Sequence, residues 1–182
     1  MYLDKLTSLL LPPDNVDTIS IKKNIEFVEK RFNFQFPKDY IEFSLIYGSG
    51  QINEFISIYS AINSDAYYEM IERNCQYYRE LKKRFPDEYQ HNVFPEDGGL
   101  FPLGRTDGGS LIWWHTAPES ENWFIVVYDE NSWEYEEYNM QICEFIYKYF
   151  TKQIECVAFS DSLREEEPYF VANNFDFKQY CH

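Results

Sequence analysis

The sequence predicts an α+β fold in which an antiparallel β-meander sheet packs against helices. Apolar residues recur at helical spacing in the first half of the chain, whereas residues 100–138 hold short β-rich segments separated by turn-forming residues. The chain has 182 residues, of which 45% are hydrophobic and 20% aromatic, enough for a core without metal or disulfide. We therefore expect a single domain over residues 1–182, with a core at about 18–151 and a C-terminal extension at 152–182.

Two helices are expected near the start of this core. The first covers about 20–33, with Thr18 or Ser20 as its N-cap. The second starts at Pro37, because proline suits the first turn of a helix, and ends at Gly48 in a left-handed conformation. Four apolar side chains at i, i+4, i+7 and i+11 define the inner face of the first helix: Ile21, Ile25, Val28 and Phe32.

A strand, a long helix and a loop follow. Residues 51–60 are rich in Ile, Phe and Tyr without helical period, which predicts a strand. Asn63 or Ser64 is expected to cap a helix that ends before Pro86, and residues 86–99 form a surface loop. One face of this helix is apolar except for Asn74, and consists of Tyr67, Ile71, Asn74, Tyr78, Leu81 and Phe85.

The meander comes next, and a last helix follows it. Asn139 is the expected N-cap of that helix. For the extension we expect packing on the same core, with residues 157–159 as a further strand. The predicted meander strands are 100–105, 110–115, 123–129 and 133–138, and the inner side of the last helix carries Ile142, Ile146, Tyr149 and Phe150.

The stretch FPLGRTDGGSLIWWHT, residues 101–116, contains three glycines and resembles a phosphate-binding loop only superficially. A phosphate loop needs a lysine and a following helix, whereas SLIWW is typical of a strand. Asp107-Gly108 between two strand-like runs instead predicts a hairpin tip. Ser110 lies outside a nucleophile-elbow motif, and His91 and His115 lack metal or triad spacing. We therefore predict no catalytic residue, no cofactor and no metal site.

The charge of the chain is strongly negative. It has 16 Lys and Arg against 31 Asp and Glu, a net charge of −15, which disfavours nucleic acid and anionic membranes as partners. Residues 119–167 hold 13 acidic and three basic residues, a balance of −10. Such a segment is typical either of a solvated face that keeps the protein soluble or of a surface that binds a basic protein.

Tryptophans accompany these acids. Trp113 and Trp114 are adjacent in a predicted strand, so they point to opposite faces of the sheet. If helices cover only one face, Trp114 points outward as a binding anchor; if both faces are covered, it belongs to the core. The candidate partner-binding residues are Trp114, Asp129, Glu130, Trp133, Glu134 and Glu136.

The cysteines and the N-terminal segment indicate the compartment. Four cysteines are scattered without a CxxC pair, which is typical of reduced thiols. Residues 6–11 are too short for a signal sequence or a membrane span. We expect a cytoplasmic protein.

Two segments resemble the SUKH superfamily, named for yeast cell-wall-assembly regulators and their bacterial relatives. These are EKRFNFQFPKDYIEFSLIYGSG and FPLGRTDGGSLIWW, and the likeness covers about residues 18–151. Its pieces are a helix, a second helix that starts at Pro37 and is followed by glycine, and a later strand pair that contains Pro102, Gly104, Gly108 and Gly109. Where many members place Gly-Asp, this chain has Gly109-Ser110.

The resemblance implies a SUKH-like α+β fold without established catalytic residues. For bacterial members it implies an immunity protein that binds and neutralises a protein toxin, often a nuclease, of polymorphic or contact-dependent systems. A basic toxin domain is then the expected partner. The alternative is a regulatory or scaffold protein that binds a peptide or protein partner, and a third hypothesis is an unrecognised hydrolase.

Overall fold

The computed structural model describes residues 1–61 and 64–172, which form helices and a seven-stranded sheet. The helices are α1 (Tyr2–Leu9), α2 (Thr18–Phe32), α3 (Lys38–Tyr47), α4 (Ser64–Arg84) and α5 (Ile142–Phe150), with short 3-10 helices η1 (Ser120–Asn122) and η2 (Asp161–Arg164). The strands are β1 (Gly50–Ile52), β2 (Ile56–Ile58), β3 (Leu100–Thr106), β4 (Leu111–His115), β5 (Phe124–Asp129), β6 (Glu134–Tyr138) and β7 (Phe170–Ala172).

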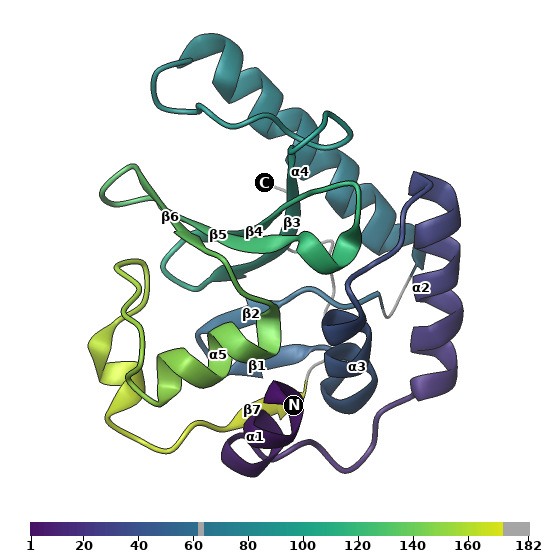
Figure 1. Ribbon diagram of the computed structural model, residues 1–182, viewed down its shortest axis with the longest axis vertical. Coiled ribbons are helices and arrows are strands. Elements are labelled where there is room, and N and C mark those ends of the chain that lie inside the picture. Colours follow the sequence, from purple (N-terminus) through teal and green to yellow (C-terminus); the bar gives the residue numbers. More distant parts are fainter. Residues whose placement is uncertain (62–63, 173–182) are drawn as a thin grey trace.

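The strands form one antiparallel sheet in the order β6-β5-β4-β3-β2-β1-β7 (Figure 1). The predicted α+β class and the meander from β3 to β6 are confirmed, each strand within one residue of its expected limits. The single strand expected over 51–60 is wrong. Asn53 and Glu54 adopt left-handed conformations there and turn the chain into the β1–β2 hairpin.

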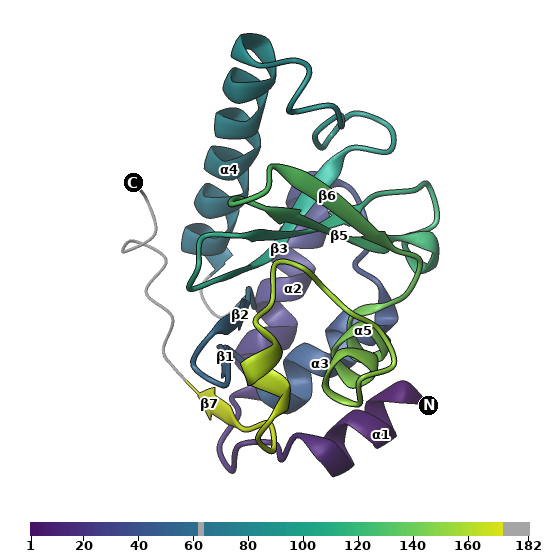
Figure 2. The ribbon, with the colours of Figure 1, turned by 90° about the vertical axis from the view of Figure 1, so that its left-hand side faces the viewer.

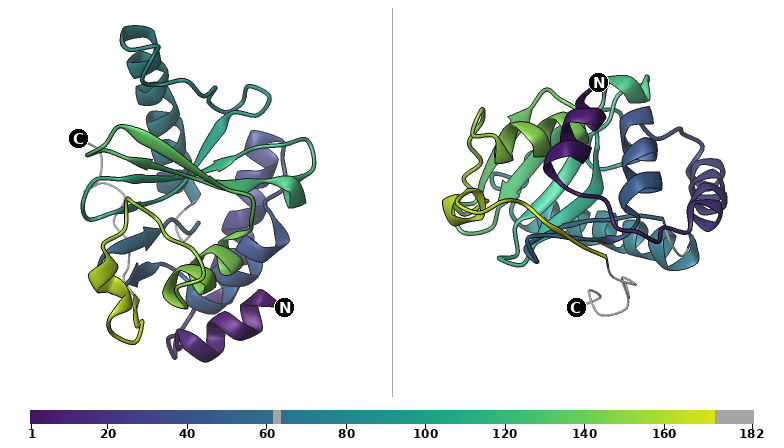
Figure 3. Two further views of the ribbon diagram at one scale, coloured as in Figure 1. Left: turned by 60° about the vertical axis from the view of Figure 1, so that its left-hand side comes forward. Right: turned by 90° about the horizontal axis from the view of Figure 1, so that it is seen from below.

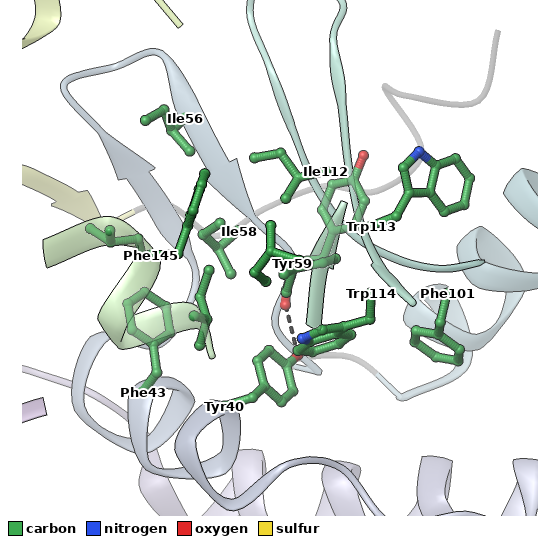
Figure 4. Packing of buried hydrophobic residues seen from close by; sticks show 14 of the residues in the cluster. Tyr40, Phe43, Ile56, Ile58, Tyr59, Phe101, Ile112, Trp113, Trp114 and Phe145 are labelled. Atoms are coloured by element: carbon green, nitrogen blue, oxygen red, sulfur yellow. Dashed lines mark hydrogen bonds between the residues drawn. The ribbon is translucent and has the colours of Figure 1, made fainter. Parts of the chain in front are cut away.

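Helices cover both faces of the sheet (Figure 2). Trp113 and Trp114 leave β4 on opposite sides (Figure 4), and their exposed fractions are 2% and 0%. The Trp113 ring lies 5.5 Å from that of Tyr78 in α4, whereas the Trp114 ring lies 4.8 Å from that of Tyr40 in α3. Trp114 therefore belongs to the core, as expected for a sheet that is covered on both faces. The alternative expectation, that Trp114 anchors a partner, is wrong.

Buried tyrosine hydroxyls connect the layers. The Tyr40 hydroxyl donates to the carbonyl oxygen of Tyr59, at 2.7 Å, and thereby holds α3 to the residue after β2 (Figure 4). The Tyr47 hydroxyl donates to the carbonyl oxygen of Leu10, at 2.6 Å, and holds the end of α1. Each bond satisfies a polar group inside an aromatic core, where an unpaired hydroxyl would be costly.

Several helix ends differ from the prediction. Asp17, rather than Thr18 or Ser20, caps α2, because its carboxylate accepts from the Ser20 amide at 3.0 Å. Helix α5 starts after Gln141 without a side-chain cap of its own, so the cap expected at Asn139 is wrong. Asn63 lies outside the described residues. Helix α1 was not predicted; it packs beside α5, where the rings of Tyr2 and Tyr147 are 5.9 Å apart (Figure 3).

The β3–β4 turn confirms the predicted hairpin but not its detail. The Gly109 amide donates to the carbonyl oxygen of Thr106, at 3.1 Å, so Asp107 and Gly108 occupy the tip. The positive φ that the turn needs, 95°, is at Gly109 rather than at Gly108. This is the hairpin geometry in which a left-handed residue follows a tight turn.

The C-terminal extension adds an edge strand to the sheet. Strand β7 pairs with β1, in the register Gln51 opposite Val171. Residues 157–159 form a turn, so the strand expected there is wrong. Residues 173–182 lie outside the described part of the chain.

Three of the four cysteines lie in the described part as buried free thiols: Cys75, Cys143 and Cys156. Burial raises the pKa of Cys75 and of Cys156 to about 12. Within residues 1–61 and 64–172, no helix is both long and apolar enough to cross a membrane.

Gly48→Ala should lower the free energy of unfolding by about 1 kcal/mol. Gly48 ends α3 with φ 69° and ψ −138°, and an added Cβ would meet Val16 at 3.4 Å, an ordinary contact, so the cost lies in the backbone. Urea denaturation measures it. Gly108→Ala is the matched control, since φ is not positive there and the nearest atom lies at 3.6 Å. Equal losses in the two variants would contradict a backbone cause.

Asp39→Ala should destabilise the protein by about 1 kcal/mol, because the Asp39 carboxylate accepts from the Cys143 amide, at 2.8 Å, and caps α5 from α3. Asp39→Asn keeps an acceptor. Burial raises the pKa of Asp39 above 3.8, so the folded state holds this proton more tightly and wild-type stability falls as pH rises through the folded pKa. The free energy of unfolding of Asp39→Asn should therefore rise relative to that of wild type as the pH increases above the ordinary aspartate pKa of about 4. A difference between the two free energies that stays constant with pH would contradict this.

Candidate functional site

An acidic groove of about 600 Å³ lies between the loop that follows α4 and the β5–β6 hairpin. Four of its side chains are carboxylates and two are aromatic. It is lined by Asp87, Glu88, Gln90, His91, Trp133, Glu134, Tyr135 and Glu137. We call these residues the acidic groove.

Asp129 shapes the hairpin that forms one wall. It is 5% exposed, and its carboxylate accepts from the amides of Asn131, at 3.1 Å, and Ser132, at 3.2 Å, and from the Ser110 hydroxyl, at 3.2 Å. Burial opposes ionisation, but the hydrogen bonds from Ser132 and Asn131 outweigh it and hold the pKa of Asp129 below its ordinary value. Asp129 is thus an ionised cap of the turn and not an exposed contact residue.

Trp133 lies at the end of this turn and is the exposed aromatic residue of the groove. Its amide donates to the carbonyl oxygen of Asp129, at 2.8 Å, and its φ is 64°. A bulky residue at positive φ is an outlier that costs about 1–2 kcal/mol. The side chain is nevertheless 53% exposed, so its packing within the chain does not explain why a tryptophan stands there.

The floor of the acidic groove is a rigid aromatic layer. The hydroxyls of Tyr135 and Tyr78 are 2.8 Å apart, which joins β6 to α4. The Tyr128 ring packs against that of Tyr135 at 4.8 Å. Because burial raises the pKa of Tyr135 well above its ordinary range, the floor stays neutral under physiological conditions.

The opposite wall is held by one lysine. Lys82 in α4 donates from Nζ to the carbonyl oxygens of Gln90, at 3.1 Å, and His91, at 2.8 Å, and to Oδ1 of Asn92, at 3.0 Å. These three bonds hold the loop in one conformation. Because the Lys82 ammonium group is bonded to these oxygens, it does not pair with the carboxylates of the acidic groove, which can therefore interact with a partner.

His91 does not neutralise the groove. Its Nε2 lies 3.9 Å from Oε1 of Glu137, a contact that favours the charged imidazole. Burial is the larger effect and lowers the pKa of His91 below 6.5. The imidazole is therefore neutral at pH 7, and the carboxylates of the groove lack a charged histidine beside them.

Of the predicted partner-binding residues, Trp133 and Glu134 lie in the acidic groove and Glu130 is exposed at the tip of the hairpin. Trp114 and Asp129 are buried. Glu136 is not part of the groove. Its carboxylate accepts from the Val157 amide, at 2.8 Å, on the side of β6 opposite to Tyr135 and Glu137.

The sequence interpretation missed Asp87, Glu88 and Glu137 in the groove. Strand alternation offers a signal for Glu137: once Tyr135 is assigned to the covered face, Glu137 shares that side and Glu136 does not. The two acids of the loop carry no such signal, because their approach to β6 depends on the tertiary fold.

The residues considered for catalysis are held in structural contacts. The Ser110 hydroxyl is bonded to Asp129, and the rings of His91 and His115 lie edge to face, 6.2 Å apart. Among the described residues, no cluster of three or more His, Cys, Asp or Glu side chains is arranged to hold a metal ion.

Comparison with known proteins identifies the family. No curated protein and no solved structure matches the chain. A family model described as SMI1-KNR4 cell-wall (SUKH_6) matches residues 22–146, which is more than half of the chain and spans α2 to α5. The chain therefore belongs to the SMI1-KNR4 family of the SUKH superfamily.

Proposed function

We propose that this protein is a non-enzymatic immunity protein that neutralises a basic protein toxin domain by binding it at the acidic groove. The observation that carries the proposal is Trp133, a half-exposed tryptophan in a left-handed conformation among four carboxylates. Local strain that the fold maintains in a surface residue is a reason to seek a function for that residue.

Trp133 has the properties of an interface anchor. Tryptophan is enriched among residues that dominate binding energy, and it works best when its surroundings are held in place before binding. Here Asp129 fixes the turn and Tyr135 fixes the floor. A partner that covers the ring therefore orders few additional side chains on this protein.

The carboxylates define the chemistry of the partner. Asp87, Glu88, Glu134 and Glu137 line the groove, and the net charge of −15 extends the attraction over the rest of the surface. Such a field attracts a cationic domain and speeds its association. Toxins that act on nucleic acid present basic surfaces for their substrate, so a nuclease domain fits this charge.

Co-expression with the toxin domains encoded in the genome of origin tests the proposal. We expect one basic domain to be lethal alone, harmless with this protein, and recovered with it as a complex on size exclusion. If every such domain remains toxic, toxin neutralisation is wrong. Binding of a non-toxic partner or peptide at the same groove would instead favour the regulatory or scaffold role.

Trp133→Asn should weaken toxin binding at least about 30-fold, because an anchoring tryptophan contributes about 2 kcal/mol or more. Asparagine tolerates positive φ, so the free energy of unfolding should stay within about 1 kcal/mol of wild type. Calorimetric titration and thermal denaturation measure the two effects. Phe27→Ala, which removes another exposed aromatic ring on α2, is the control and should bind as wild type. If Trp133→Asn bound the toxin with wild-type affinity, Trp133 would not be the anchor.

Reversing Glu134 and Glu137 to Lys should slow association with the toxin at low salt more than it speeds dissociation. The difference from wild type should shrink near 1 M salt, where the Debye length is about 3 Å. Stopped-flow kinetics over a salt series measures this. Reversal of Glu166 and Glu167, which are exposed on the extension, makes the same change in net charge at another place. Equal slowing by both pairs would show that net charge, and not the acidic groove, steers the toxin.

A further inference from the structure

Strand β6 is the last strand at one end of the sheet, so its outer edge faces no other strand of the described chain (Figure 1). Its five residues, Glu134–Tyr138, all pair with β5. In an antiparallel ladder, alternate residues bond to the neighbouring strand and the others direct their N–H and C=O groups away from it. Within residues 1–61 and 64–172, β6 makes one backbone hydrogen bond besides this ladder, which the Met140 amide donates to the carbonyl oxygen of Tyr138 at 2.7 Å.

The contacts that do reach β6 from the C-terminal extension hold its side chains. The Tyr138 hydroxyl donates to the carbonyl oxygen of Glu155, at 2.7 Å, and the Glu136 carboxylate accepts from the Val157 amide, at 2.8 Å. Together with the ladder to β5, these bonds fix the strand before any partner arrives. A partner that pairs with the outer edge therefore orders little of this protein.

The two ends of the sheet differ in length and charge. Strand β7, at the other end, has three residues, Phe170–Ala172, and no charged side chain. Strand β6 is longer and reads EYEEY, with three glutamates in five residues. Glu134 and Glu137 are exposed, and 54% of the Glu137 side chain is accessible.

These glutamates determine which strand can join β6. If two copies paired antiparallel about Glu136, that residue would face itself, and three glutamates from each copy would meet on one short ladder. Like charges opposite each other destabilise a strand pair, whereas opposite charges stabilise it. The edge of β6 thus disfavours a second copy of this chain and favours a strand that carries Lys or Arg.

We propose that a basic strand of the partner adds to the outer edge of β6 and extends the sheet. Its backbone bonds to the outward N–H and C=O groups of β6, and its cationic side chains lie opposite Glu134 and Glu137. Partners that add a strand to a sheet edge gain affinity from main-chain bonds and specificity from side chains.

The inference rests on the proposed function for the identity of the partner as a toxin. Glu134, Tyr135 and Glu137 belong both to β6 and to the acidic groove, and Trp133 directly precedes the strand. Strand pairing at the edge and anchoring by Trp133 are therefore parts of one interface.

A basic peptide tests the edge without the toxin. The probe is acetyl-Thr-Val-Lys-Thr-Val-Lys-Thr-amide, whose lysines lie opposite Glu137 and Glu134 in antiparallel pairing. N-methyl groups on its second, fourth and sixth residues leave one edge able to pair and prevent pairing between peptides. The matched control is the isomer with N-methyl groups on the third, fourth and fifth residues, which has the same side chains and charge but blocks both edges.

In ¹⁵N-labelled full-length protein, the amide resonances of residues 134–138 should shift saturably with the probe at millimolar concentration. The control isomer should bind at least about tenfold more weakly, the effect of losing one or two hydrogen bonds. A probe with glutamate in place of lysine should leave these resonances unmoved, because its charges would face those of Glu134 and Glu137.

Several results would overturn the proposal. Equal affinities of the two isomers would show that side chains dock without strand pairing, and shifts around Val171 would place the peptide at β7. Shifts of the β6 amides with protein concentration alone would place a second copy at this edge. The absence of a saturable shift at millimolar probe would exclude strand addition.

Failure of strand pairing and failure of the proposed function are distinguishable. If a toxin is neutralised but the two isomers bind equally, the immunity role remains and strand pairing is wrong. If the isomers differ as expected but no toxin is neutralised, β6 is still an edge for basic strands, and the regulatory or scaffold role is favoured.

Discussion

Two adjacent tryptophans on a central strand impose the arrangement of the whole molecule. Because successive residues of a strand point to opposite faces, Trp113 and Trp114 both become buried only if helices cover both sides of the sheet. Helix α4 covers one ring, and α3 covers the other. The acidic groove lies on the α4 side of the sheet, beside the loop that follows α4.

The sequence predicted those parts of the fold that are specified by local signals. Helices α2 to α5 carry apolar side chains at helical spacing, and the β3–β6 meander carries tight turns, so their existence follows from nearby residues. Helix α1 is short and depends on packing against α5, as the Tyr2 and Tyr147 rings show. The split into β1 and β2, like the addition of β7, is decided by pairing partners far along the chain and has no local signal.

Only the part of the candidate site that is specified by neighbouring residues could be predicted from the sequence. Trp133 and Glu134 are neighbours in a hairpin, so charge and aromatic content drew attention to them. The opposite wall comes from the loop at Asp87 and Glu88, which Lys82 holds in place through backbone carbonyls, an interaction without a pattern in the sequence. Trp114 and Asp129 were wrongly predicted to contact a partner, because the burial of a side chain depends on its neighbours in the fold. Trp114 packs against α3, and the Asp129 carboxylate caps its own turn.

The pairing of β1 with β7 has a consequence for biosynthesis. The two strands are separated by about 120 residues, which a ribosome adds in roughly 6–24 s at about 5–20 residues per second. During that interval the outer edge of β1 has no strand beside it, and an open edge is a template for pairing with other chains. Strand β1 has only three residues, Gly50–Ile52, and so offers little length to a wrong partner until β7 has been synthesised.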